Sequence, residues 1–264
     1  MPTPSPAHEA WTPTDHHVVH SYLFDPPVDP HLPDAAVVVV VPGLGLPQYV
    51  FPTAAALSRR GVMCAVLDVP GFAATGRHGS GPQVHEIGQT TAEWVEARAL
   101  SGPVVVLGHS TGAQGALDAA LRLQDTQPGL GLVMAGPTFT PRQRRFPRMA
   151  AAAATAYLRD SPGALVVVPT ALRHSPGVLS IVRSGMRDAP DERLRQLRVP
   201  LTLTAGEADT FAPEDWLTRL ASAADASPSV IVRTLSGSHN NPYTHAEQVA
   251  AVVLGAVARV ANAA

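Results

Sequence analysis

Residues 35–41 hold the feature that most constrains the fold, two alanines followed by five consecutive valines. Valine is β-branched and favours extended backbone, and a run without polar alternation belongs in a strand covered on both faces. Such strands occur in α/β proteins, where helices pack on each side of a mainly parallel sheet. Ala35–Val41 therefore predicts a central strand of a sheet of this kind.

The rest of the chain repeats the pattern, with short apolar runs separated by stretches of helical periodicity. This alternation is typical of βαβ units. We expect further strands at Val18–Phe24 (an edge strand), Val62–Asp68, Val104–Leu107, Leu130–Ala135, Pro200–Ala205 and Val230–Leu235. We expect helices at Thr53–Arg60, Val84–Leu100, Thr111–Gln124, Pro213–Ala224 and Ala246–Val260. The predicted fold class is α/β, with a mainly parallel central sheet flanked by helices.

The alternation stops at residues 138–198, which have no convincing strand pattern. This stretch holds an alanine-rich helix at Met149–Leu158 and a polar amphipathic segment near Asp191–Leu197. A connection of this length in a compact domain usually has structure of its own and often a function. We therefore predict a core of residues 1–137 and 199–264 with a helical insertion at 138–198, the alternative being a separate second domain.

Composition and charge narrow the classes of function. Of the 264 residues 45% are hydrophobic, enough for one sizeable core. The 19 basic and 21 acidic side chains leave a net charge of −2, so we expect no nucleic-acid partner. The single cysteine, Cys64, excludes an internal disulfide. No apolar run approaches the roughly 20 residues of a membrane span, and residues 1–11 do not read as a signal peptide, so we expect a cytoplasmic protein with no membrane partner.

Gly108-His109-Ser110-Thr111-Gly112 is a G-x-S-x-G motif between a predicted strand and a predicted helix. In this context the serine lies on a sharp turn that exposes its hydroxyl at the end of the strand, and small residues two positions away avoid collisions. The alternative is a glycine-flanked loop serine with no role. We interpret Ser110 as a candidate nucleophile.

A serine hydroxyl needs a base to remove its proton and a carboxylate to orient that base. The strand Pro200–Ala205 leads into a turn with two carboxylates, Glu207 and Asp209, and the strand Val230–Leu235 leads to His239. Carboxyl ends of parallel strands meet at one edge of a sheet, so these groups can reach Ser110. We prefer Asp209 to Glu207 because its shorter side chain loses less rotamer freedom in holding an imidazole.

The other histidines are weaker candidates. His245 falls near the start of the last helix, where we expect a surface position. His16 and His20 have the spacing of a metal-binding pair on a helix, but their surroundings favour a strand, and we interpret them as part of a solvated segment. No metal site is predicted.

Negative charge on a substrate oxygen is best held by backbone N–H groups that are already fixed in direction. Thr111, directly after the candidate nucleophile, provides one such group, and Leu44, between Gly43 and Gly45, is our choice for the other. The alternative for this glycine loop, a dinucleotide fingerprint, fails because Gln48 stands where a third glycine is required.

With these residues assembled, the chain from about Ala35 to Val260 resembles the α/β-hydrolase superfamily. Ser110 matches the nucleophile of its elbow, Gly206-x-x-Asp209 its acid-bearing turn, and His239 the histidine after its last strand. Asp68-Val69-Pro70-Gly71-Phe72 is similar to a loop common in the family. Pro42 departs from the histidine that many relatives have there, but a backbone donor does not depend on it.

The resemblance implies a cofactor-free serine hydrolase, with residues 138–198 where relatives insert a helical cap. We expect a small-molecule substrate, and our preferred class is a small or medium apolar carboxylic ester or a lactone. Thioesters, carbon–carbon bonds of β-diketone-like compounds and acyl transfer remain alternatives on the same residues, as does a non-catalytic small-molecule-binding member. Side chains that could line the pocket are Phe139, Met149, Tyr157 and Trp216.

Overall fold

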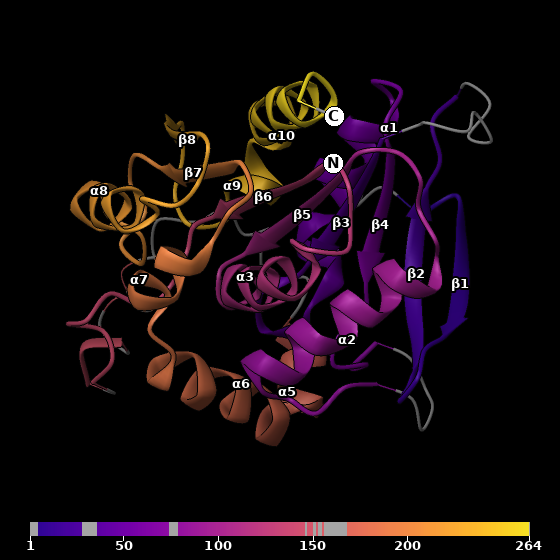
Figure 1. The fold of residues 1–264 in the computed structure, drawn as a ribbon. Coiled ribbons are helices and arrows are strands. Elements are labelled where there is room, and N and C mark those ends of the chain that lie inside the picture. The colour runs from indigo at the N-terminus through magenta and orange to yellow at the C-terminus, as the bar shows by residue number, and fades with distance from the viewer. Residues whose placement is uncertain are drawn as a thin grey trace.

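The computed structural model describes residues 5–27, 36–73, 79–145, 147–149, 152, 155 and 168–263. Their strands form one sheet in the order β1-β2-β4-β3-β5-β6-β7-β8 (Figure 1). The strands are β1 (His8–Pro13), β2 (Val18–Phe24), β3 (Val37–Val41), β4 (Met63–Leu67), β5 (Val104–His109), β6 (Leu130–Ala135), β7 (Leu201–Gly206) and β8 (Val230–Leu235). From β4 to β8 all neighbours are parallel, while β2 is antiparallel to both β1 and β4. The predicted mainly parallel sheet is therefore confirmed.

Helices cover both faces of this sheet. The first face is covered by α1 (Phe51–Ser58) and α10 (Ala246–Ala261), and the second by α2 (Val84–Ala97), α3 (Thr111–Leu123) and α8 (Glu214–Ala223). The other helical elements are η1 (Gly43–Gly45), η2 (Pro47–Val50), α5 (Val168–Arg173), α6 (Ser175–Arg187), α7 (Pro190–Arg193), η4 (Leu194–Gln196) and α9 (Asn241–Thr244).

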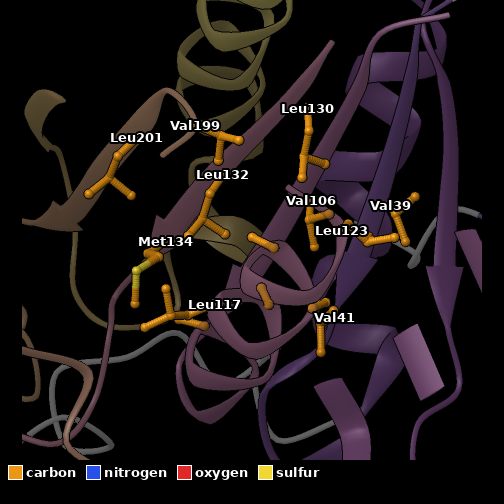
Figure 2. Close-up of a cluster of buried hydrophobic side chains, with 14 of the residues drawn as sticks. Val39, Val41, Val106, Leu117, Leu123, Leu130, Leu132, Met134, Val199 and Leu201 are labelled. Atoms are coloured by element: carbon orange, nitrogen blue, oxygen red, sulfur yellow. The ribbon is translucent and has the colours of Figure 1, made fainter. Parts of the chain in front are cut away.

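The valine run supplies both hydrophobic cores at once. Val37, Val39 and Val41 point to the face of α2 and α3, and Val38 and Val40 pack on the face of α1 and α10. Figure 2 shows the first of these cores, in which side chains of β3, β5 and β6 meet α3. Alternation of side chains along a strand explains why a run without polar residues is needed here, since either face would otherwise bury a polar group.

The N-terminal hairpin corrects one prediction. Val18–Phe24 is a strand, but β1 pairs with it from His8↔Leu23 to Pro13↔Val18, so β1 and not β2 is the edge of the sheet. Only three of the six residues of β1 are apolar, and only Thr12 is buried. A strand with so little apolar periodicity gives no strong pattern.

The same hairpin corrects the interpretation of His20. This side chain is buried, with its Nδ1 3.2 Å from Asp68 and its Nε2 2.9 Å from Glu9 of β1. The solvated setting predicted for it was wrong, because β1 covers it. The His16 side chain is exposed and has a different partner from His20, with its Nδ1 2.7 Å from Glu93 Oε1.

The stretch predicted as an insertion contains helices and no strand in its described part, where α5, α6, α7 and η4 lie. In the predicted helix Met149–Leu158, residues 149, 152 and 155 are helical, and the others lie outside the described residues. Helix α6 packs against α2, α3 and η1. It therefore lies beside the turn at which β5 ends and α3 begins.

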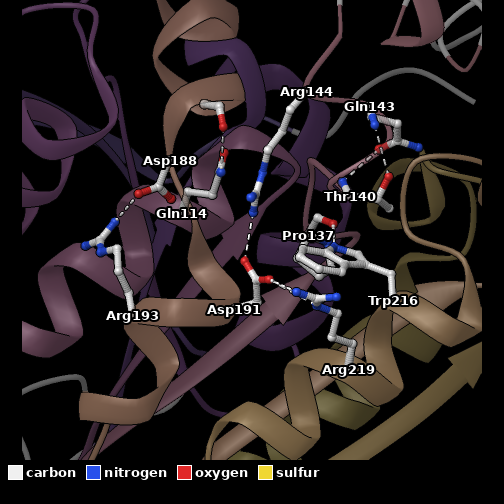
Figure 3. A network of polar contacts seen from close by, with 11 residues as sticks. Gln114, Pro137, Thr140, Gln143, Arg144, Asp188, Asp191, Arg193, Trp216 and Arg219 are labelled. Carbon is white, nitrogen blue, oxygen red and sulfur yellow. Dashed lines mark hydrogen bonds and ion pairs between the residues drawn. The ribbon is translucent and has the colours of Figure 1, made fainter.

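Ion pairs join this helical stretch to the core (Figure 3). Arg193 of α7 bonds to Asp118 of α3 at 2.6 Å. It also bonds to Asp188 at 2.8 Å, as Figure 3 shows. Asp191 accepts from Arg144 and from Arg219 of α8, both at 2.7 Å. Within the described part of the chain, no helix has the length and apolar character that crossing a membrane requires.

Cys64 gives a test of the closed core. The thiol lies in β4 and is fully buried, which raises its pKa and disfavours the reactive thiolate. We expect a thiol reagent at pH 8 to modify native protein slower than unfolded protein by a factor on the order of 10³ or more. Ellman's reagent with and without guanidinium measures this, with Cys64→Ala as the blank. Fast labelling of native protein would mean that β4 is not enclosed.

Candidate active site

Ser110 lies on a strained turn between β5 and α3. Its backbone has φ 56° and ψ −125°, a conformation that non-glycine residues rarely adopt. A Cβ on Gly108 would come within 2.4 Å of the carbonyl oxygen of Gly112, and a Cβ on Gly112 within 2.3 Å of that of Val41. Both glycines are therefore required by close backbone packing, as the motif predicts.

The three polar residues expected to meet at the carboxyl edge of the sheet do meet there. His239 Nε2 is 2.8 Å from Ser110 Oγ, and His239 Nδ1 is 3.0 Å from Asp209 Oδ2. A carboxylate only accepts, so Nδ1 carries the proton and donates it to Asp209. Nε2 is then left as the acceptor for the Ser110 hydroxyl, which is the protonation state a general base needs.

Asp209 is held as an anion. Burial works to raise the pKa of this carboxyl, but the charge and hydrogen bond of His239 and the backbone N–H groups of Phe211 and Ala212 outweigh burial, so the pKa is lowered. Glu207, two residues earlier in the turn, is exposed to solvent. The geometry therefore favours Asp209 over Glu207.

Of the two amides expected to face a substrate oxygen, that of Leu44 contacts the side chain of the other residue, Thr111. Leu44 has φ 53° within η1, and its N–H donates to Thr111 Oγ1 at 2.8 Å. Thr111 begins α3, and the first N–H groups of a helix have no partner within it. A Cβ on Gly43 would lie 2.9 Å from Ser110 Cβ, so this glycine loop packs directly against Ser110.

The residues predicted to line a pocket have different settings. Phe139 is buried beside Gly185 of α6. Met149 is half-buried, and Tyr157 lies outside the described residues. Trp216 is packed in the core and donates its Nε1–H to the Pro137 carbonyl at 2.9 Å (Figure 3).

Some residues at the site were not singled out from the sequence. The Phe211 ring lies 4.6 Å from that of His239. Gly136, with φ +55°, lies under the Asp209–His239 pair, and His109 bonds to the backbone of His239. A glycine after β6 and the unspecified position of G-x-S-x-G are the only sequence signals for the last two. His245, expected at the surface, is half-buried against Thr244.

The described residues include no group of three or more His, Cys, Asp or Glu side chains that could hold a metal ion. The polar groups of this edge are instead arranged in a line from carboxylate to imidazole to hydroxyl. A mostly parallel sheet whose carboxyl edge carries such a line, beside a strained strand-to-helix serine, defines the class of α/β hydrolases.

The comparisons with known proteins agree with this class. The model of the Alpha/beta hydrolase family matches residues 38–252, and the chain belongs to that family. No curated protein sequence matches the chain.

Solved structures share the fold over nearly their whole length. The enol-lactonase from Burkholderia xenovorans has a TM-score of 0.69 at 17% identity, covering 94% of this chain and 100% of that chain. Proline iminopeptidase from Mycobacterium smegmatis has a TM-score of 0.71 at 19% identity, covering 97% and 99%. A thermophilic esterase from Thermogutta terrifontis has a TM-score of 0.67 at 17% identity, covering 96% and 99%. At these identities the likeness shows the fold alone.

Replacing each of the two carboxylates by its amide, one at a time, separates their roles. We expect Asp209→Asn to lower kcat by a factor on the order of 10⁴, because the amide neither orients the imidazole nor stabilises its cation, while the folded structure is kept. Glu207→Gln is the matched control and should retain activity, since its side chain is exposed. Steady-state kinetics on a p-nitrophenyl ester measures both. Loss of activity in the Glu207 variant alone would reverse the assignment.

Gly136→Ala tests the packing beneath the pair. The added Cβ would lie 3.1 Å from both Asp209 Oδ2 and His239 Nδ1, so we expect it to displace the imidazole and to lower kcat by roughly 100-fold. Gly61→Ala introduces the same kind of positive-φ strain at φ +87° with nothing within 4 Å, so it should lower only the melting temperature. Equal kcat in the two variants would contradict this account.

Proposed function

We propose that this protein is a serine hydrolase that cleaves a small or medium apolar carboxylic ester or lactone through an acyl-enzyme on Ser110. The observation that carries the proposal is the continuous hydrogen-bond line from Asp209 through His239 to Ser110 Oγ. A structural serine has no need of a base with a buried carboxylate behind it. A non-catalytic binding protein would leave the strain at Ser110 without a purpose.

Acylation follows from the geometry. Ser110 Oγ attacks the carbonyl carbon while His239 Nε2 takes the hydroxyl proton, and the carbonyl electron pair moves onto oxygen. When the tetrahedral oxyanion collapses, the bond to the alcohol oxygen breaks, and that oxygen takes the proton from His239. Asp209 stabilises the imidazolium in between, because it is already an anion and already hydrogen-bonded to Nδ1.

Deacylation uses the same groups in reverse. Water gives a proton to His239 Nε2 as it attacks the acyl carbon. When the second tetrahedral intermediate collapses, the bond from the acyl carbon to Ser110 Oγ breaks, Oγ takes that proton from His239, and the acid leaves. The backbone N–H groups of Thr111 and Leu44 hold the oxyanion in both halves of the reaction. Thr111 Oγ1 is the acceptor for Leu44 in the resting structure and has to give up this hydrogen bond to the substrate oxygen.

We assign residues 138–198 to a cap over the site. Gln114 of α3 donates its side-chain N–H to the Gly185 carbonyl of α6 at 3.0 Å, one turn along the helix from Ser110. His174, just before α6, stacks on Phe72 at 4.9 Å, and Phe72 itself packs against Gly45 of the oxyanion loop. These contacts support a role for α6 in forming the wall of the substrate pocket, with Phe139, Met149 and Tyr157 as proposed lining residues.

The proposed substrate class is apolar because the Phe211 ring lies 4.6 Å from that of His239, and the Phe139 ring packs beside Gly185 of α6. A lactonase and an esterase among the structures of the same fold are consistent with ester and lactone substrates. Proline iminopeptidase also shares the fold, so an activity screen should include amide substrates.

Labelling with a fluorophosphonate tests the nucleophile. We expect one adduct per chain on Ser110, lost in Ser110→Ala and reduced by at least about 100-fold in rate in His239→Ala, because the hydroxyl is then without a base. Peptide mass spectrometry locates the adduct, and p-nitrophenyl esters of graded length, lactones, thioesters and prolyl amides define the substrate. If folded protein takes no label on Ser110, the hydrolase proposal is wrong and a non-catalytic binding protein is favoured.

A further inference from the structure

His109 is a buried histidine that the reaction described above does not use. It is the last residue of β5, directly before Ser110, and its side chain is enclosed between the sheet and the glycine loop. Its imidazole ring lies 5.1 Å from that of His239. A second imidazole this close to the proposed base affects that base by position, by charge or by both.

The hydrogen bond of His109 determines its tautomer. Nε2 is 3.0 Å from the backbone carbonyl oxygen of His239, and a carbonyl only accepts, so Nε2 carries the proton. Among the described residues, Nδ1 has no hydrogen-bond partner, and a Cβ on Gly43 would lie 3.3 Å from it. The ring is therefore held by a single directed bond, which it donates to the residue that carries the base.

His109 also remains neutral. Burial and the nearby charge of His239 lower its pKa to about 3, even though the bond to the His239 backbone and the charge of Asp209 act in the opposite direction. At any working pH it is thus a donor without charge. A cation at this place would repel the imidazolium that His239 becomes during the reaction.

The turn that carries His239 is buried at Ser238 and Asn240, although it follows the edge strand of the sheet. It follows β8, none of whose residues is buried, whereas all six residues of β5 are. Gly237 bends the backbone at φ +90°, and its carbonyl accepts from Ala208 at 3.0 Å. The bond from His109 therefore joins the turn after this edge strand to β5, a central strand whose six residues are all buried.

We propose that His109 is a positioning residue for the base: its Nε2–H holds the backbone carbonyl of His239 and so fixes the turn that presents the imidazole to Ser110. The inference rests on the proposed function of that imidazole. It makes the unspecified residue of the G-x-S-x-G motif part of the same unit as the nucleophile beside it. One short segment then orients both the hydroxyl and the base that acts on it.

Two substitutions separate the hydrogen bond from the space that the ring fills. His109→Gln keeps an N–H donor near the Nε2 position, and His109→Leu keeps much of the volume without a donor. We expect kcat per fluorophosphonate-labelled Ser110 to fall by about 10- to 100-fold in the Leu variant and by less than about threefold in the Gln variant, with KM nearly unchanged in both. Thr91→Val, which removes a buried hydrogen bond within α2 at 2.8 Å, is the control and should lower only the melting temperature.

The pH profile adds a readout that loss of stability does not move. In His109→Leu the acid limb of kcat/KM should shift to lower pH, because an imidazole that drifts from Asp209 is easier to deprotonate. An unshifted profile together with wild-type kcat per labelled serine would overturn the inference. Equal losses in the Gln and Leu variants would overturn it too, because the donor would then be irrelevant.

A measurement on the unaltered protein covers the case in which the Leu variant does not fold. Nitrogen-15 NMR of the histidine rings, assigned with His109→Gln, should find His109 neutral and protonated on Nε2 from pH 5 to 8. A ring protonated on Nδ1 alone would exclude the bond, and a cation in this range would contradict the uncharged donor that the inference requires. If the wild-type chain hydrolyses nothing and takes no label, the proposed function fails instead, and the NMR result still decides whether the bond to His239 exists.

Discussion

Close packing of β5 against α3 is the constraint on which the whole site depends. At Gly108 and Gly112 the strand, the helix and the neighbouring loop approach so closely that no Cβ fits between them. The chain can pass this point only with Ser110 in a backbone conformation that costs on the order of 1–3 kcal/mol. The two buried cores on either side of the sheet supply the free energy that holds the turn in place.

Electrostatics at this edge depend on burial in two opposite ways. Asp209 is buried, yet its hydrogen bonds to His239 and to two backbone amides keep it ionised. His109 is buried to a similar degree, has one neutral partner, and stays uncharged. The same low-dielectric surroundings thus strengthen the charge that the proposed base needs and suppress the charge that would oppose it.

The parts of the structure that follow from periodicity and from one well-defined turn could be predicted from the sequence. The strands from β3 to β8 are apolar enough to be recognised, and the order Ser110, Asp209, His239 follows from which strands end at the same edge. The hairpin strand β1 could not be predicted because its residues are mostly exposed and show no apolar alternation. His109 and Gly136 were missed because their roles arise only when distant turns come together, which spacing along one chain does not report.

The positive φ of Ser110 places stability and reactivity in competition at a single residue. Glycine adopts this conformation without a side-chain penalty, so Ser110→Gly would relieve the turn while deleting the hydroxyl. A laboratory selection for heat tolerance alone would therefore tend to discard the very atom that the proposed chemistry requires, and thermal engineering of this chain has to keep position 110 outside its search.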